Sequence, residues 1–155
     1  KAALNNDTRF LKSTPETTLT IPSTARKIIS AGAYDFRTRA YADFSGRGFT
    51  RQTNQIKPDV VAPGVNIITA GNRGGYEAVT GTSFATPFVT GAAALLMQWG
   101  IINGNDPFLY GEKVKACLIR GARHLPGYDI WPNERLGYGS LCVSESLPLG
   151  NGREG

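Results

Sequence analysis

The sequence contains few of the side chains on which metal and redox sites depend. In 155 residues there are two cysteines, Cys117 and Cys142, and one histidine, His124. Two cysteines are too few for a disulfide framework, and their spacing is not that of a zinc site. We therefore expect no metal ion and no cofactor. Because each cysteine lies among apolar residues, we interpret both as small buried thiols, and the redox compartment stays open.

Long blocks of one charge and long apolar runs are also missing. The net charge of +5 arises from scattered lysines and arginines, and no nucleic-acid-binding motif accompanies them. We therefore expect no nucleic-acid partner. The longest apolar stretch, residues 91–97, falls far short of the roughly 20 residues that cross a bilayer, so no membrane partner is expected. Apolar residues make up 41% of the chain and charged residues 19%, as is typical of a globular domain.

Composition divides the chain into three segments. Residues 1–19 are polar and irregular, which predicts a connecting segment. Residues 20–147 hold the predicted strands and helices, and residues 148–155 are predicted to form a mobile tail. The chain starts with Lys1 and its only methionine is Met97, so we interpret it as a fragment of a longer protein.

Short apolar runs predict strands in the first half of the chain. Residues 27–34 are typical of a buried strand. Residues 59–70 predict two strands joined by a Pro-Gly turn, and residues 76–80 predict a further extended segment after a glycine-rich turn. The polar stretch 37–57 is predicted to be a loop.

Helices are predicted in the second half. Residues 83–99 are apolar almost all round, which predicts a helix that is buried on every side. Asp106-Pro107 is typical of a helix start, with the aspartate as cap and the proline at the first helical position. Residues 111–120 predict an amphipathic helix. Its inward residues are Val114, Leu118 and Ile119, and its outward residues are Glu112, Lys113 and Lys115.

A serine stands at the predicted start of the apolar helix, within Gly81-Thr82-Ser83-Phe84-Ala85-Thr86-Pro87. A helix start offers unpaired N–H groups and a positive dipole end, which stabilise an oxyanion, and Gly81 lets a substrate backbone approach. Ser83 is therefore a candidate nucleophile, provided that a base takes its proton. The alternative interpretation is that Thr82 or Ser83 only caps the helix.

Four stretches resemble the subtilases, the family of subtilisin-like serine proteases. Residues 81–91 match the family's serine motif, G-T-S-x-A-[ST]-P-x-x-[AT]-G, at every defined position, and residues 57–64 look like the K-P-D-[IV]-x-A-P-G segment that precedes it. Residues 21–33 resemble the strand that follows the family's substrate-binding loop, and residues 136–139 look like its closing G-x-G element. The resemblance covers residues 20 to about 145. It implies an α/β fold, the C-terminal portion of a three-layer structure in which helices flank a mostly parallel sheet.

The resemblance also implies an activity and a site. The longer protein would be a serine endopeptidase that hydrolyses peptide bonds of a peptide or protein substrate through an acyl-enzyme at Ser83. The Ser83 N–H would be one donor of the oxyanion hole. The residues implied to bind substrate are Thr20, Ile21 and Pro22, which match the loop beside the substrate pocket, together with Gly81 and Thr82.

The rest of the catalytic machinery has no counterpart in the sequence. In subtilases the catalytic Asp and His precede the serine, whereas His124 follows it and is interpreted as a surface or helix-end histidine. Asp59 matches the structural K-P-D segment. Neither Asn5 nor Asn6 has the flanking glycines of the family's oxyanion asparagine.

The missing groups lead to two hypotheses about function. In the first, the N-terminal remainder of the same protein supplies them, so this chain alone is inactive and associates with that remainder or with itself. In the second, the protein is a non-catalytic subtilase homologue that binds or regulates other proteins. Residues 7–22 also look like the return from an inserted domain, as in the Csp-type clostridial subtilases, which would imply a bacterial protein that is extracellular or spore-associated.

Overall fold

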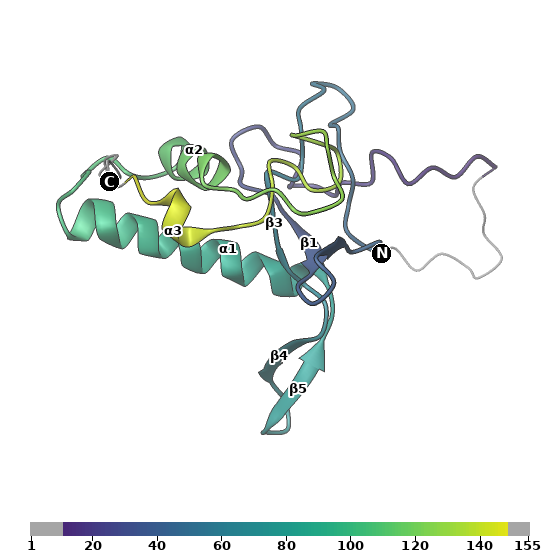
Figure 1. Ribbon diagram of the computed structural model, residues 1–155, viewed down its shortest axis with the longest axis horizontal. Coiled ribbons are helices and arrows are strands. Elements are labelled where there is room, and N and C mark those ends of the chain that lie inside the picture. The colour runs from purple at the N-terminus through teal and green to yellow at the C-terminus, as the bar shows by residue number, and fades with distance from the viewer. Residues whose placement is uncertain (1–10, 149–155) are drawn as a thin grey trace.

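The computed structural model describes residues 11–148 of the chain (Figure 1). Asn5, Asn6, the first ten residues of the predicted connecting segment and all of the predicted tail except Pro148 lie outside these residues. The fold is of the mixed α/β class, as expected. A small sheet packs against one long helix, and two shorter helices complete the described part of the chain.

The central sheet has three strands in the order β2-β1-β3. β1 (Ala31–Asp35) pairs in parallel with β3 (Val60–Pro63) and antiparallel with β2 (Ala40–Tyr41). β3 is buried because apolar residues cover both faces of a parallel pair. Residues 27–30, predicted to be part of the first strand, lie outside it. The chain turns at residues 27–28, where the Ile28 carbonyl accepts hydrogen bonds from two lysine side chains, and residues 29–30 are irregular. β2 lies within the predicted loop, and its only strand partner is β1.

A separate hairpin follows the sheet. β4 (Ile67–Ala70) and β5 (Tyr76–Val79) pair antiparallel, and the Gly71 N–H donates to the Gly75 carbonyl at 3.0 Å across the turn. This arrangement agrees with the two extended segments and the glycine-rich turn that the sequence predicts. The hairpin projects away from the rest of the molecule and leads directly into the long helix (Figure 1).

The long helix is α1 (Thr82–Met97), which continues as one π-helical stretch, η1 (Gln98–Ile102). Its buried residues, Ala85, Val89, Ala92 and Leu96, lie on one face, which packs against β1 and β3.

The prediction that this helix is buried on every side is wrong for the described structure. Phe88 is 44% exposed and Leu95 is 52% exposed, because the three-stranded sheet covers only one side of α1. By length and composition, residues 82–102 would suffice to cross a membrane, a test that core helices of soluble proteins also pass.

The second helix begins later than one sequence signal indicates. α2 (Glu112–Arg120) follows Gly111, and Asp106-Pro107 starts no helix. The Asp106 carboxylate instead accepts a hydrogen bond from the Phe108 N–H at 3.0 Å and pairs with Lys113 at 2.8 Å. Val114 and Leu118 are buried, as predicted for the inward face of this helix, and Ile119 is half-buried.

The chain then returns to the sheet and ends in α3 (Val143–Ser146). The Val61 N–H donates to the Gly139 carbonyl at 2.9 Å, and the Leu141 N–H donates to the Val61 carbonyl at 2.8 Å. A side chain at Gly137 would collide with the Pro58 carbonyl oxygen, so this close approach requires glycine. Cys117 and Cys142 are free thiols that are half-buried, not buried as expected, and Cys117 packs against the hydrophobic core.

Candidate active site

Glycine contacts fix the backbone that leads into α1. The Gly81 N–H donates to the Gly64 carbonyl at 2.8 Å, and the Gly64 N–H donates to the Tyr34 carbonyl at 3.1 Å. A Cβ atom on Gly64 would lie 2.6 Å from the Cβ of Ala33 and 3.0 Å from the Gly81 carbonyl oxygen. Because only glycine allows this approach, the start of α1 is held directly against β1.

Ser83 is the second residue of α1 and is exposed. The N-cap residue is Gly81, and no side chain caps the helix start. The interpretation of Thr82 or Ser83 as a cap is therefore wrong. Within residues 11–148, the Ser83 hydroxyl has no hydrogen-bond partner, so the described fold makes no use of it.

The backbone amide of Ser83 is also unengaged. In the first turn the Phe84 N–H donates to the Gly81 carbonyl at 3.1 Å, but no group in the described part of the chain accepts from the Ser83 N–H. An unpaired N–H at a helix start carries a partial positive charge. The Ser83 N–H can thus donate to an oxyanion that forms at a carbon bonded to the serine oxygen.

The residues predicted to bind substrate fall into two groups. Gly81 and Thr82 adjoin Ser83, and the Thr82 carbonyl accepts from the Thr86 hydroxyl at 3.0 Å. Thr20, Ile21 and Pro22 form a separate exposed turn, in which Ile21 is 89% exposed.

The hydrogen bonds of this turn are local. The Ala25 N–H donates to the Pro22 carbonyl at 2.9 Å, and the Ser23 hydroxyl donates to the Thr20 carbonyl. In the range 11–148, no hydrogen bond or ion pair links the turn to the start of α1. The structure does not bring the two groups into direct contact through polar interactions.

His124 lies at the surface, as expected. It is exposed, and its ring stacks on Trp131 with 4.4 Å between the ring centroids and an interplanar angle of 1°. No hydrogen bond joins His124 to Ser83 in the described structure. No group of three or more His, Cys, Asp or Glu side chains among the described residues is arranged to hold a metal ion.

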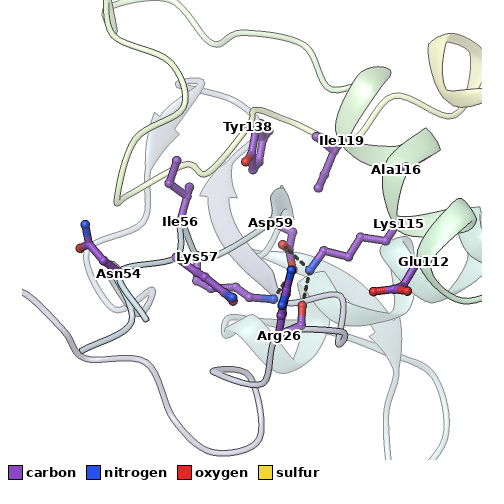
Figure 2. A pocket seen from close by; sticks show the side chains of 11 residues that line it. Arg26, Asn54, Ile56, Lys57, Asp59, Glu112, Lys115, Ala116, Ile119 and Tyr138 are labelled. Atoms are coloured by element: carbon purple, nitrogen blue, oxygen red, sulfur yellow. Dashed lines mark hydrogen bonds and ion pairs between the residues drawn. The ribbon is translucent and has the colours of Figure 1, made fainter. Parts of the chain in front are cut away.

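A buried cluster of charges lies beside a cavity of about 430 Å³ (Figure 2). We call Lys57, Asp59 and Lys115 the Asp59 cluster. The carboxylate of Asp59 accepts from the Ser30 N–H at 2.7 Å and pairs with Lys57 at 2.7 Å and with Lys115 at 2.9 Å. Asp59 therefore has a structural role, as the K-P-D segment suggests.

Burial affects the ionisation of this cluster. The Lys57 side chain is 1% exposed, and burial lowers the pKa of its ammonium, while the Asp59 carboxylate opposes this shift. Sequence reasoning placed Lys115 on the outer face of its helix, which is wrong, because its side chain is 16% exposed and points to Asp59 (Figure 2). The position of Lys57 next to an apolar strand indicates from the sequence that this lysine is buried. No local sequence feature indicates the same for Lys115.

The chain is similar to several known proteins. A model of the subtilase family matches residues 2–139. The solved structure of the CspB protease from Clostridium perfringens is similar with a TM-score of 0.84 and 47% identity, over 90% of this chain and 30% of that chain. The serine protease AprX of Bacillus subtilis is 33% identical over 154 residues, which cover 84% of this chain and 32% of AprX.

Another relative comes from an animal. The membrane-bound transcription factor site-1 protease of Mus musculus is 34% identical over 137 residues, which cover 85% of this chain but 12% of that protein. The chain thus spans a third or less of each of these proteins, and every one of them is named as a protease.

Proposed function

We propose that this chain, which belongs to the subtilase family, carries the nucleophile of a serine endopeptidase, with Ser83 in that role. One observation carries the proposal. Ser83 is exposed at a helix start, and the described fold uses neither its hydroxyl nor its amide. Because no group of the described chain engages either of them, both are accessible to a substrate, and an N–H at a helix start can donate to an oxyanion. The substrate would be a peptide or a protein.

The reaction follows from these two groups. The Ser83 oxygen attacks the scissile carbonyl carbon while a general base takes the hydroxyl proton. The carbonyl oxygen becomes an oxyanion, to which the Ser83 N–H donates. The intermediate collapses to an acyl-enzyme ester, and the leaving amine takes the proton from the base. Water then hydrolyses the ester, and the serine hydroxyl is restored.

The proposed base lies outside this sequence. The only histidine is His124, which stacks on Trp131 and is not bonded to Ser83. In the subtilase order of the triad, the Asp and His come before the serine. We therefore expect a longer protein to be active and the 155-residue chain alone to be inactive.

The same remainder of the protein is the proposed partner of α1. Phe88 and Leu95 are exposed on its outer face, and no atom lies within 4 Å of the position that a Cβ of Gly91 would take. Glycine inside a helix costs about 1 kcal/mol relative to alanine, a cost that close approach of another backbone would explain. Without that remainder, we expect two copies of the chain to associate through this face.

Labelling with a fluorophosphonate tests the nucleophile. In the longer protein we expect the reagent to label Ser83, because it needs an activated serine beside an oxyanion hole. Ser83→Ala should remove labelling and reduce hydrolysis by on the order of a millionfold.

A matched control uses another serine. Ser144 is exposed on α3, so Ser144→Ala should leave labelling and hydrolysis unchanged. Absence of labelling in the folded longer protein would contradict the proposal and favour the non-catalytic hypothesis.

A further inference from the structure

Two lysines hold the backbone of residues 26–28. The Ile28 carbonyl accepts hydrogen bonds from Lys57 Nζ at 2.7 Å and from Lys115 Nζ at 3.1 Å. The Arg26 carbonyl accepts from Lys115 Nζ at 2.9 Å. Lys115 belongs to α2 and lies 89 residues after Arg26 in the sequence. The Lys115 ammonium on α2 thus donates hydrogen bonds to two carbonyls of a segment that is distant along the chain.

The same ammonium groups are anchored on Asp59. Lys115 Nζ lies 2.9 Å from one carboxylate oxygen, and Lys57 Nζ lies 2.7 Å from the other. The Lys115 ammonium therefore donates to two carbonyls and also forms an ion pair with one carboxylate oxygen. Hydrogen bonds from a charged donor are stronger than neutral ones. These contacts together fix the position of this ammonium.

Few other contacts hold residues 26–28. Their side chains are exposed, and Ile28 is 39% exposed. Lys27 pairs with Glu112 of α2 at 3.7 Å, but both side chains are largely solvent-exposed, and such pairs contribute little. The segment is therefore positioned through its backbone carbonyls and not through packing of its side chains.

The turn Thr20–Pro22 precedes this segment, with residues 23–25 between them. Its own hydrogen bonds are local, and the bond from the Ala25 N–H to the Pro22 carbonyl connects it to the residue immediately before the segment that the lysines hold. Movement of residues 26–28 would therefore be passed to the turn. We infer that Lys115 is a positioning residue for the substrate-binding turn, acting through the Arg26 and Ile28 carbonyls. This inference rests on the proposed function.

The geometry explains why this residue is a lysine. A lysine ammonium carries its donors at one atom, and here it donates to two carbonyls while it pairs with the Asp59 carboxylate. The planar guanidinium of arginine holds its donors in a fixed fork, which does not match this arrangement of acceptors. Lys115→Arg should therefore keep the positive charge but lose the hydrogen bonds to the Arg26 and Ile28 carbonyls, as Lys115→Met should.

The first measurement is hydrogen exchange on the 155-residue chain. In Lys115→Met we expect faster amide exchange over residues 20–30 than in the unchanged chain. The matched control is Lys113→Met on the same helix, which loses only an exposed pair with Asp106. Lys115→Arg serves as the second variant, because it keeps a cation beside Asp59 if Lys115→Met fails to fold.

The second measurement is kinetic and uses the longer protein. For a peptide substrate that extends along the turn, we expect KM to rise on the order of tenfold in both Lys115 variants. For a small ester that does not reach the turn, kcat should equal that of the control, because Lys115 makes no contact with Ser83. Such a split separates positioning from general structural damage.

Each outcome decides a separate point. Unchanged exchange over residues 20–30 in both Lys115 variants would overturn the inference, and so would faster exchange with an unchanged KM for the peptide. An equal loss on peptide and ester would also overturn it. Fluorophosphonate labelling of the unchanged protein reports on the proposed function by itself. If it fails, the substrate role of Lys115 fails too, whereas the exchange result still stands.

Discussion

The Asp59 cluster and the start of α1 use polar groups in opposite ways. In the cluster, Asp59 and Lys57 are almost completely buried, and each ionised group faces partners within the chain. At the start of α1, the hydroxyl and amide of Ser83 are exposed and have no partner among residues 11–148. Stability and the proposed chemistry therefore depend on separate residues. Substitutions in one region should leave the property of the other intact.

Removal of the central carboxylate should have the largest effect on stability. Asp59→Ala leaves Lys57 buried without its counter-charge, and breaking a buried pair in this way costs about 3–5 kcal/mol in the free energy of unfolding. Asp43→Ala is the control, because its side chain is 97% exposed and touches Arg47 only at 4.0 Å. Urea unfolding measures both variants. Equal, small losses would mean that the cluster does not carry the stability we assign to it.

The buried ammonium should make stability depend on pH. Burial lowers the pKa of Lys57 below the ordinary value of 10.5. Between the lowered pKa and 10.5, the unfolded chain keeps a proton that the folded chain has released. The free energy of unfolding therefore rises with pH in this window, by at most about 1.4 kcal/mol per pH unit.

Lys57→Met isolates this contribution, because it removes the titrating group. We expect the stability of the unchanged chain to rise relative to that of Lys57→Met as the pH increases toward about 10. Burial raises the pKa of Tyr34, which has the opposite effect above pH 10 but is the same in both proteins. A difference that stays flat or falls with pH would show that the Lys57 pKa is not lowered.

Leu95 tests the outer face of α1, where the effect on stability should be small. Leu95→Lys removes an apolar side chain that is 52% exposed, so the free energy of unfolding should change by less than about 0.5 kcal/mol. Its effect should appear in association, because the charge disrupts the exposed apolar face. Sedimentation should show less self-association than in the unchanged chain, whereas Asn103→Lys, at an exposed polar site, should not change it. A folded monomer in the unchanged chain would contradict this expectation.

Ser83→Ala should have the smallest effect on stability. Loss of a side chain that caps a helix costs about 1 kcal/mol, but the cap of α1 is Gly81 and the Ser83 hydroxyl is not bonded in the described structure. We therefore expect no measurable change in the melting temperature of the 155-residue chain. A loss of the size expected for a cap would show that the hydroxyl serves the fold, and the contrast with the Asp59 cluster would disappear.

Features that depend on local pattern could be predicted from the sequence. Residues 81–91 and 57–64 identify the family, because the chemistry and the close glycine contacts allow few other residues there. The hairpin and the buried face of α2 follow from turn glycines and from apolar spacing, which act over a few residues. The nucleophile candidate belongs to this class, since a helix start is a local feature.

Features that depend on partners distant along the chain could not be predicted from the sequence and became visible in the tertiary structure. Lys115 looks like a solvent-facing residue of an amphipathic helix, yet it is directed inward because Asp59 and two carbonyls from another part of the chain lie there. Asp106-Pro107 has the pattern of a helix start, but the Asp106 carboxylate accepts a hydrogen bond from the Phe108 N–H and pairs with Lys113. The apolar composition of α1 predicted complete burial of the helix, but its burial depends on how much of its surface the sheet covers. A local sequence pattern limits the conformations that are favourable for a segment, and the free energy of its contacts with distant residues determines which of them it adopts.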